Sequence, residues 1–364
     1  MDAAARQAFE NGMALARAGN PTAAAAAFTE AVEREPAWIM ARLNRGSAWF
    51  LAKNFPAALA DFDSVLVADP KLVDVYLNRS VVRRTMGDPA GADADLAKAL
   101  ELAPDNLAVL NSRGAERLRT GDMAGAAADF TRVLEGNPNH PPTLLARSAA
   151  RLHLLDLKGA LADCDEVLKV DPKSRDGLIN RATANMMLQN FAAALVDIEK
   201  LLELEPGSFE ILYIRGMARI GLEKYAEALT DLNEVVKKAP QLAAGWAGRA
   251  NAKYHLSDPT APADYREAFK VDATSATRVI LRLVRDQSKY RPNEVLAECQ
   301  KFRAKDRNDA ISLVRRALTR LFQGRPADAN LDFAAFRKLL PGDAAILDTL
   351  IAAANKAIAE KKKG

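Results

Sequence analysis

Arginine and acidic residues recur along the chain at matched intervals, and they are the first side chains whose spacing could carry chemistry. The arginines lie about one every 34 residues, and each has an acid 15 or 16 residues later. The arginines are Arg45, Arg79, Arg113, Arg147, Arg181, Arg215, Arg249, Arg282 and Arg316, and the acids are Asp61, Asp95, Asp129, Asp163, Asp197, Asp231, Asp264, Glu298 and Asp332. Arginine and carboxylate at a fixed spacing can form a bidentate pair that fixes geometry. We therefore predict a structural ladder, with a basic surface for phosphate or acidic peptide as the alternative.

A second set of arginines lies four residues after members of the first set. It comprises Arg83, Arg117, Arg151, Arg219 and Arg320. The spacing assigns no acid to these side chains, so we predict that they are available to a ligand. They form a candidate basic stripe for a polyanion or nucleic acid.

Histidine and cysteine form no pattern typical of a metal site or a nucleophile. The three histidines, His140, His153 and His255, show neither His-x-x-x-His nor Glu-x-x-His spacing. We expect His153 and His255 to be exposed on helices, or alternatively to touch a ligand. Cys164 and Cys299 are far apart and are predicted to be buried apolar residues. We therefore expect no metal, no cofactor and no enzymatic activity.

A second periodicity predicts the elements that hold these side chains. Proline recurs every 34 residues, at Pro36, Pro70, Pro104, Pro138, Pro172, Pro206 and Pro240. With proline at position 32 of each unit, position 8 is small, position 20 is nearly always alanine, and position 24 is apolar and mostly large. Small residues let two helices approach, a large residue fills the space beside them, and proline ends the second helix. Each unit therefore predicts a helical hairpin, with the arginines at positions 7 and 11 and the acid at position 23. Because the first unit lacks both members of the ladder, we expect each arginine to pair within its own unit.

These columns resemble the tetratricopeptide repeat, and the similarity covers nearly the whole chain. The resemblance implies an all-α fold, a right-handed α-solenoid of about ten hairpins with a C-terminal capping helix. It divides the chain into repeats 1 to 8 (5–275), repeats 9 and 10 (276–342), and a capping helix with a basic tail (343–364). Repeat 9 is divergent, because Leu283 and Val295 stand where small residues belong.

The resemblance also implies where a partner would bind. In the family the first helices line the concave side, and their positions 2, 5, 6, 9, 12 and 13 face the ligand. Position 5 is largely apolar here, and position 6 is often asparagine, whose carboxamide can both donate to and accept from a peptide unit. The candidate groove residues are Leu43, Asn44, Leu77, Asn78, Asn111, Ile179, Asn180 and Tyr213. The asparagines could instead hydrogen-bond within the solenoid. Position 5 holds no lysine, which argues against the carboxylate clamp of chaperone-binding relatives.

The predicted function is a protein-interaction scaffold or adaptor that holds a peptide or helix of a partner protein in the concave groove. The alternative is a polyanion or nucleic-acid binder that uses the second arginine set and the basic C-terminal segment. That segment, from Thr277 onward, has 19 Lys and Arg against 10 Asp and Glu, although the whole chain has a net charge of only +4. The final run of Lys361, Lys362 and Lys363 is also typical of a solvated tail.

The N-terminal sequence and the cysteine usage bear on location. No charged segment followed by an apolar run opens the chain, and no apolar stretch approaches the roughly 18 residues of a membrane span. The cysteines form no closely spaced pair. We therefore expect a cytoplasmic protein with no membrane partner.

Overall fold

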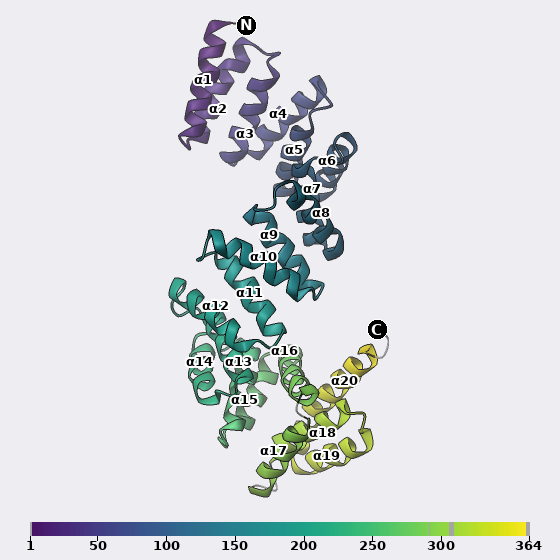
Figure 1. Cartoon of the computed structure of the whole chain (residues 1–364). Coiled ribbons are helices and arrows are strands. Elements are labelled where there is room, and N and C mark those ends of the chain that lie inside the picture. The colour runs from purple at the N-terminus through teal and green to yellow at the C-terminus, as the bar shows by residue number, and fades with distance from the viewer. Residues whose placement is uncertain (1, 291, 306–308, 362–364) are drawn as a thin grey trace. The chain divides into compact units, whose positions relative to one another are not determined.

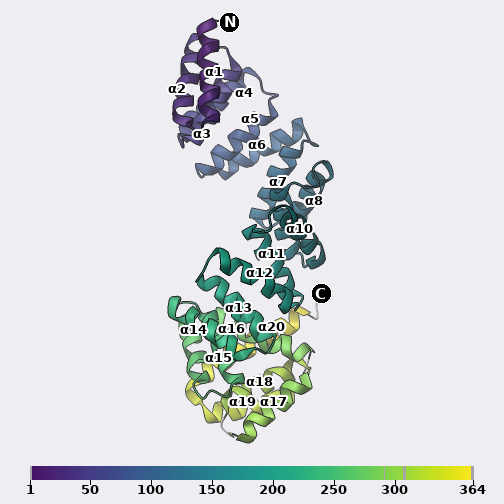
Figure 2. The same cartoon turned by 60° about the vertical axis from the view of Figure 1, so that its left-hand side comes forward.

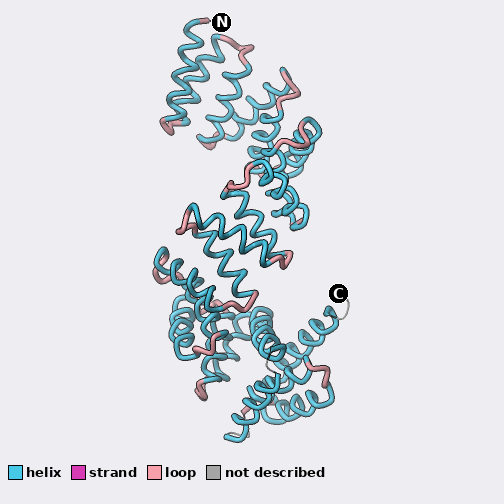
Figure 3. The backbone as a smooth tube through the Cα atoms, viewed as in Figure 1, coloured by secondary structure: helices cyan, strands magenta, loops and turns pink. Residues whose placement is uncertain are grey.

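The computed structural model describes residues 2–290, 292–305 and 309–361. For residues 286–290, 304, 305 and 361 it describes the backbone alone. Over these residues the chain is all-α, with helices joined by short turns and no strand (Figures 1 and 3). The basic tail residues Lys362 and Lys363 lie outside the described residues, as does the side chain of Lys361. The all-α prediction is confirmed.

The chain forms two compact units, 1–172 and 173–364. The helices of the first unit are α1 (Ala3–Arg17), α2 (Pro21–Arg34), α3 (Ile39–Leu51), α4 (Phe55–Ala68), α5 (Val73–Thr85), α6 (Pro89–Leu102), α7 (Leu107–Thr120), α8 (Met123–Gly136), α9 (Pro141–His153) and α10 (Leu157–Val170). Those of the second are α11 (Arg175–Met187), α12 (Phe191–Leu204), α13 (Phe209–Gly221), α14 (Tyr225–Lys238), α15 (Ala243–His255), α16 (Ala261–Tyr290), α17 (Pro292–Lys305), α18 (Ala310–Phe322), α19 (Pro326–Leu339), the 3-10 helix η1 (Pro341–Asp343) and α20 (Ala344–Lys361).

The regular hairpins turn through a short left-handed connection, and in several of them a side chain caps the second helix. Position 15 has a positive φ, both where it is glycine, as at Gly121 (φ 90°), and where it is not, as at Leu155 (φ 62°). Where the next residue is Asp122, its side chain caps the second helix, because the carboxylate accepts a hydrogen bond from the Gly125 amide at 2.9 Å. The second helix ends shortly before the repeating proline, as predicted.

The small residue at position 8 and the large residue at position 24 interlock inside the hairpin. A Cβ atom added to Gly114 would lie 2.7 Å from the Phe130 ring, and one added to Gly12 would lie 2.6 Å from Phe28. Both phenylalanines are fully buried. The predicted close approach of the two helices is therefore confirmed, and substitution of these glycines would force the rings to shift.

Some first helices of neighbouring repeats touch one another within each unit. Contacts join α3 with α5 and α7 with α9 in the first unit, and α13 with α15 in the second. Over the described residues, second helices of neighbouring repeats approach each other less closely than these pairs do. In these repeats the first helices therefore form the more closely spaced row, which is the inner row of a curved stack.

The regular pattern changes at repeats 8 and 9. Helix α16 bends at Asp272, whose backbone is extended (φ −159°, ψ 100°), so its first part belongs to repeat 8 and its second part to repeat 9. Beyond the bend, Ile280 packs in a cluster with Ala247 of α15, and Leu283 packs against a cluster that includes Leu232 of α14. The first helix of repeat 9 therefore packs against repeats 7 and 8 as well as against α17, the second helix of its own repeat.

Candidate functional site

The arginines at position 7 and the acids at position 23 form bidentate ion pairs within the same repeat. Arg113 donates from Nε to Oδ2 of Asp129 at 2.8 Å and from Nη2 to Oδ1 at 2.6 Å. The same pairing joins Arg45 to Asp61, Arg79 to Asp95, Arg147 to Asp163, Arg181 to Asp197, Arg215 to Asp231, Arg249 to Asp264 and Arg316 to Asp332. The aspartates are buried, and the hydrogen bond to Asp129 raises the pKa of the Arg113 guanidinium. The predicted pairing within a repeat is confirmed at these eight sites.

The second arginine set uses the same aspartates, which contradicts the prediction that it has no acid. Arg117 Nη1 lies 2.8 Å from Oδ2 of Asp129 and also donates to the Gly125 carbonyl at 3.3 Å. Equivalent contacts join Arg83 to Asp95, Arg151 to Asp163, Arg219 to Asp231 and Arg320 to Asp332, at 2.6 to 3.0 Å. Positions 7 and 11 lie one helical turn apart on the same face, so a carboxylate that faces one also reaches the other. The candidate basic stripe is therefore engaged in internal ion pairs.

The ladder also links one repeat to the next, which the sequence analysis missed. The remaining guanidinium nitrogen, Nη1, of Arg79 lies 2.7 Å from Oδ1 of Asp63 in the preceding repeat. Arg215 reaches Glu199 at 2.9 Å in the same way, and Arg147 reaches the Thr131 hydroxyl at 3.2 Å. The polar residue two places after the position 23 acid was the available signal. Each such arginine thus joins its own hairpin to the previous one.

The candidate asparagines have different environments. The Nδ2 of Asn44 donates to the Met40 carbonyl of its own helix at 2.8 Å, and Oδ1 of Asn111 accepts from the Thr143 hydroxyl of the next repeat at 2.9 Å. Asn78 is exposed, and Asn180 is half-buried. The internal hydrogen bonding left open by the sequence therefore occurs at Asn44 and Asn111.

The candidate apolar residues at position 5 lie below the surface. Leu43 and Leu77 are half-buried and pack against the core cluster of repeats 2 and 3, and Ile179 is half-buried as well. Tyr213 packs against the cluster that Leu283 also contacts, and burial raises the pKa of its hydroxyl. These side chains are partly buried, so the more exposed apolar area lies at other positions.

Exposed apolar side chains occur instead at positions 2, 9 and 13. Met40 and Leu51 on α3 are 52% and 64% exposed, and Val81 on α5 is 47% exposed. Together with Asn44 and Asn78 they lie at spacings that share one face of adjacent first helices. We call these five residues the repeat 2–3 surface. The family pattern includes positions 2, 9 and 13 among those facing a ligand, so the signal was present in the sequence.

Comparison with known proteins agrees with this arrangement of hairpins. The family model described as tetratricopeptide repeat matches residues 9–72, 77–141 and 179–243, which is more than half of the chain. The chain belongs to the tetratricopeptide repeat family. No curated protein matches its sequence.

Solved structures, two of them described as tetratricopeptide repeat proteins, resemble the chain at low sequence identity. A tetratricopeptide repeat protein from Parabacteroides merdae is 18% identical, covers 78% of this chain and 99% of its own, and has a TM-score of 0.45. YrrB, described as a TPR protein with an unusual peptide-binding site, is 21% identical, with 52% and 97% covered and a TM-score of 0.45. Pseudomonas aeruginosa pilF is 16% identical, with 62% and 99% covered and a TM-score of 0.49.

One histidine of this tetratricopeptide repeat protein lies in a buried polar network. The His255 ring contacts Glu298 through Nδ1 at 2.7 Å and Arg315 through Nε2 at 2.9 Å, and it stacks on Tyr225 with centroids 4.1 Å apart. Because arginine can only donate, Nε2 accepts and Nδ1 carries the proton given to Glu298. Burial, and then the charge of Arg315, lower the pKa of His255. The expectation that His255 is exposed is wrong, whereas His153 is exposed.

The remaining candidate groups have structural environments. Cys164 and Cys299 are fully buried, as predicted, and burial raises the pKa of the Cys299 thiol. Over the described residues, no three His, Cys, Asp or Glu side chains are grouped as metal ligands. In the same part of the chain, no helix has both the length and the apolar character needed to cross a bilayer.

Proposed function

We propose that the protein is an interaction scaffold or adaptor that holds a peptide or helix of a partner protein along the inner row of first helices. Proteins of this family act as protein-interaction scaffolds. The observation that carries the proposal is a contrast within the first unit. The arginines at positions 7 and 11 are bound to buried aspartates, whereas Met40, Leu51 and Val81 are exposed on first helices.

The repeat 2–3 surface supplies both apolar area and hydrogen-bonding groups. Burial of Met40, Leu51 and Val81 against a partner would remove apolar surface from water, which is the main driving force for association. The exposed carboxamide of Asn78 can donate to and accept from one backbone peptide unit of the partner. In the second unit, the proposal includes Ile179 and Asn180 at the equivalent positions 5 and 6.

The alternative polyanion function loses its principal support. The arginines of the candidate basic stripe, Arg83, Arg117, Arg151 and Arg219, each contact a buried aspartate. A phosphate would have to compete with that carboxylate for the guanidinium. We therefore propose that the partner is a protein and that it binds through an apolar surface.

The test compares two matched pairs of exposed apolar residues. The partner is first captured from source cells with the full chain and identified, and its affinity is then measured by calorimetry. Met40→Ser with Val81→Ser removes apolar area from the inner row, and we expect about thirty- to several-hundredfold weaker binding, at roughly 1–2 kcal/mol per side chain. Val67→Ser with Val170→Ser is the control, since these residues are also exposed but lie on second helices.

Salt dependence separates the two functions in the same experiment. Affinity through the apolar surface should change little between low and high salt, whereas phosphate binding should weaken steeply. The repeat 2–3 surface would be ruled out if both double variants lost affinity equally. It would also be ruled out if binding depended steeply on salt and neither double variant changed the affinity.

A further inference from the structure

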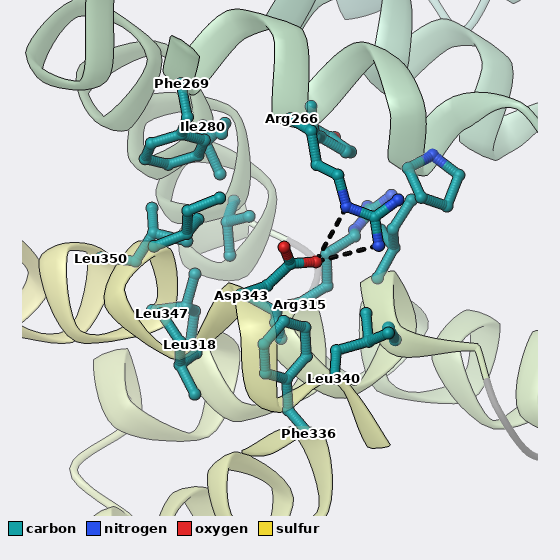
Figure 4. Close-up of a pocket in the computed structure, with 17 residues that line it drawn as sticks. Arg266, Phe269, Ile280, Arg315, Leu318, Phe336, Leu340, Asp343, Leu347 and Leu350 are labelled. Carbon is teal, nitrogen blue, oxygen red and sulfur yellow. Dashed lines mark hydrogen bonds and ion pairs between the residues drawn. The ribbon is translucent and has the colours of Figure 1, made fainter. Parts of the chain in front are cut away.

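The C-terminal helix α20 packs over first helices of the second unit as well as over repeat 10. Leu347 and Ala354 are fully buried, and Leu350 is nearly so. Leu350 and Ile346 belong to a cluster with Ile280 of α16 and Ala247 of α15, while Leu347 joins a cluster with residues of α18 and α19. Figure 4 shows Leu347 and Leu350 between Phe269 and Ile280 on one side and Leu318 on the other. Figure 2 shows α20 reaching α16.

The residues beneath α20 stand at the repeat positions that the family uses for ligands. Ile280 and Val314 are at position 5 of repeats 9 and 10, and Val284 and Leu318 are at position 9. Helix α20 therefore occupies, within its own chain, the kind of surface that the proposed function assigns to a partner in the first unit. Its occupant is an amphipathic helix.

Two ion pairs at the edge of this surface give it a charge preference. Arg266 Nε lies 2.9 Å from Oδ2 of Asp343, which precedes α20, and Arg337 Nη2 lies 2.6 Å from Oδ1 of Asp348 (Figure 4 shows the first pair). In both pairs the arginine belongs to the repeats and the aspartate to the C-terminal segment. The surface thus matches a helix that is acidic at its start.

Helix α20 leaves space beneath it. A cavity of about 80 Å³ lies between α20 and the repeats, and nearly all its lining is apolar, with Phe269, Leu318 and Phe336 among the lining residues (Figure 4). The cavity is partly open to solvent. A helix with a larger apolar side chain at the position of Ile346 or Leu350 would fill the space better than α20 does.

The geometry points to a second binding surface, beneath α20, for an acidic amphipathic helix of a partner protein, with α20 as its resident internal ligand. The partner helix follows the pattern of Asp343–Ala354. It begins with an aspartate, and a second aspartate lies five residues after the first. Apolar residues lie three, four, seven, eight and eleven residues after the first aspartate. Exchange follows mass action, because the partner binds the fraction of molecules in which α20 is released. The surface is separate from the repeat 2–3 surface, so a failure here would leave the proposed function standing.

The test breaks the same two ion pairs from opposite sides in the full chain. The probe is a fluorescent peptide of residues 341–360. Asp343→Asn with Asp348→Asn loosens α20 but leaves the receptor arginines intact, so the probe should bind roughly three- to tenfold more tightly than to the native chain. Arg266→Gln with Arg337→Gln loosens α20 equally but removes the arginines that the probe needs, so the gain should be under about twofold.

Two further probes and a folding measurement complete the experiment. A probe carrying Ile346→Phe should bind more tightly because it fills the cavity, and a probe carrying Leu347→Asp should not bind. Thermal melting should show that both double variants remain folded. Equal gains in the two variants, or no binding of the native-sequence probe to the Asp343→Asn, Asp348→Asn chain, would overturn the proposal.

Discussion

Asp129 is 2% exposed and accepts hydrogen bonds from two arginines of its own repeat. The pair with Arg113 is bidentate, whereas Arg117 makes a single bond to the aspartate and another to the Gly125 carbonyl. A buried carboxylate compensated by two cations is costly to remove, since the guanidinium groups lose their partner while remaining largely enclosed. The energetic effect should therefore exceed that of an exposed ion pair.

We expect Asp129→Ala to lower the free energy of unfolding by about 2–4 kcal/mol, between the values for exposed and fully buried pairs. Double-mutant cycles should give a larger coupling energy for Asp129 with Arg113 than with Arg117, because the former pair has two hydrogen bonds. Chemical denaturation of the single and double variants measures both. Zero coupling with Arg113 would show that the ladder does not stabilise the fold.

Sequence spacing predicted one ion-pair partner for each charged side chain. The prediction failed where a side chain has more than one partner or where its partners come from distant helices. The position 7 and 23 pairing could be predicted because both columns are absent together from the first repeat. The sharing of Asp129 by Arg117 could not be found in that way, since a carboxylate has two oxygens and accepts from more than one donor. The burial of His255 depends on Glu298 and Arg315, which come from distant helices.

At the scale of the helices, we expect repeat 9 to be the weakest hairpin. Its first helix follows the bend at Asp272, and Leu283, which stands where a small residue belongs, packs against a cluster of repeats 7 and 8. Repeat stability depends on interlocked neighbours, so this segment should open more readily than a regular hairpin. We expect lower hydrogen-exchange protection over residues 278–302 than over residues 114–130, and equal protection would refute this account.

Helix periodicity gave the apolar stripe of α20 but not the surface that the stripe meets. Leu347, Leu350 and Ala354 recur at helical spacing in the sequence, and all three are buried. However, a pattern along one helix specifies which face is apolar and contains no information on the direction in which that helix leaves the stack. The turn at Pro341–Asp343 sets that direction. The same limit applies to Leu155, whose positive φ is imposed by the hairpin geometry and not by its residue type.

At the scale of the whole chain, contacts divide the protein into units 1–172 and 173–364. The sequence predicted its first boundary after residue 275, where the repeats become irregular; that division remains a prediction about repeat type. The two boundaries describe different properties, since regular repeats can continue across a point where the contacts between hairpins decrease. In a solenoid, stability is transmitted mainly between neighbouring repeats.

This division predicts that damage to one unit stays within it, and the ladder offers a matched pair of substitutions. Asp231 in the second unit is 2% exposed and contacts Arg215 at 2.7 Å and Arg219 at 2.6 Å, as Asp129 contacts Arg113 and Arg117 in the first. Asp129→Ala should lower hydrogen-exchange protection in residues 39–68 and leave residues 175–204 unchanged. Asp231→Ala should do the reverse, because sub-global opening follows the compact units. If each substitution lowered protection equally in both segments, the chain would unfold as one cooperative stack and the boundary at Pro172 would have no energetic meaning.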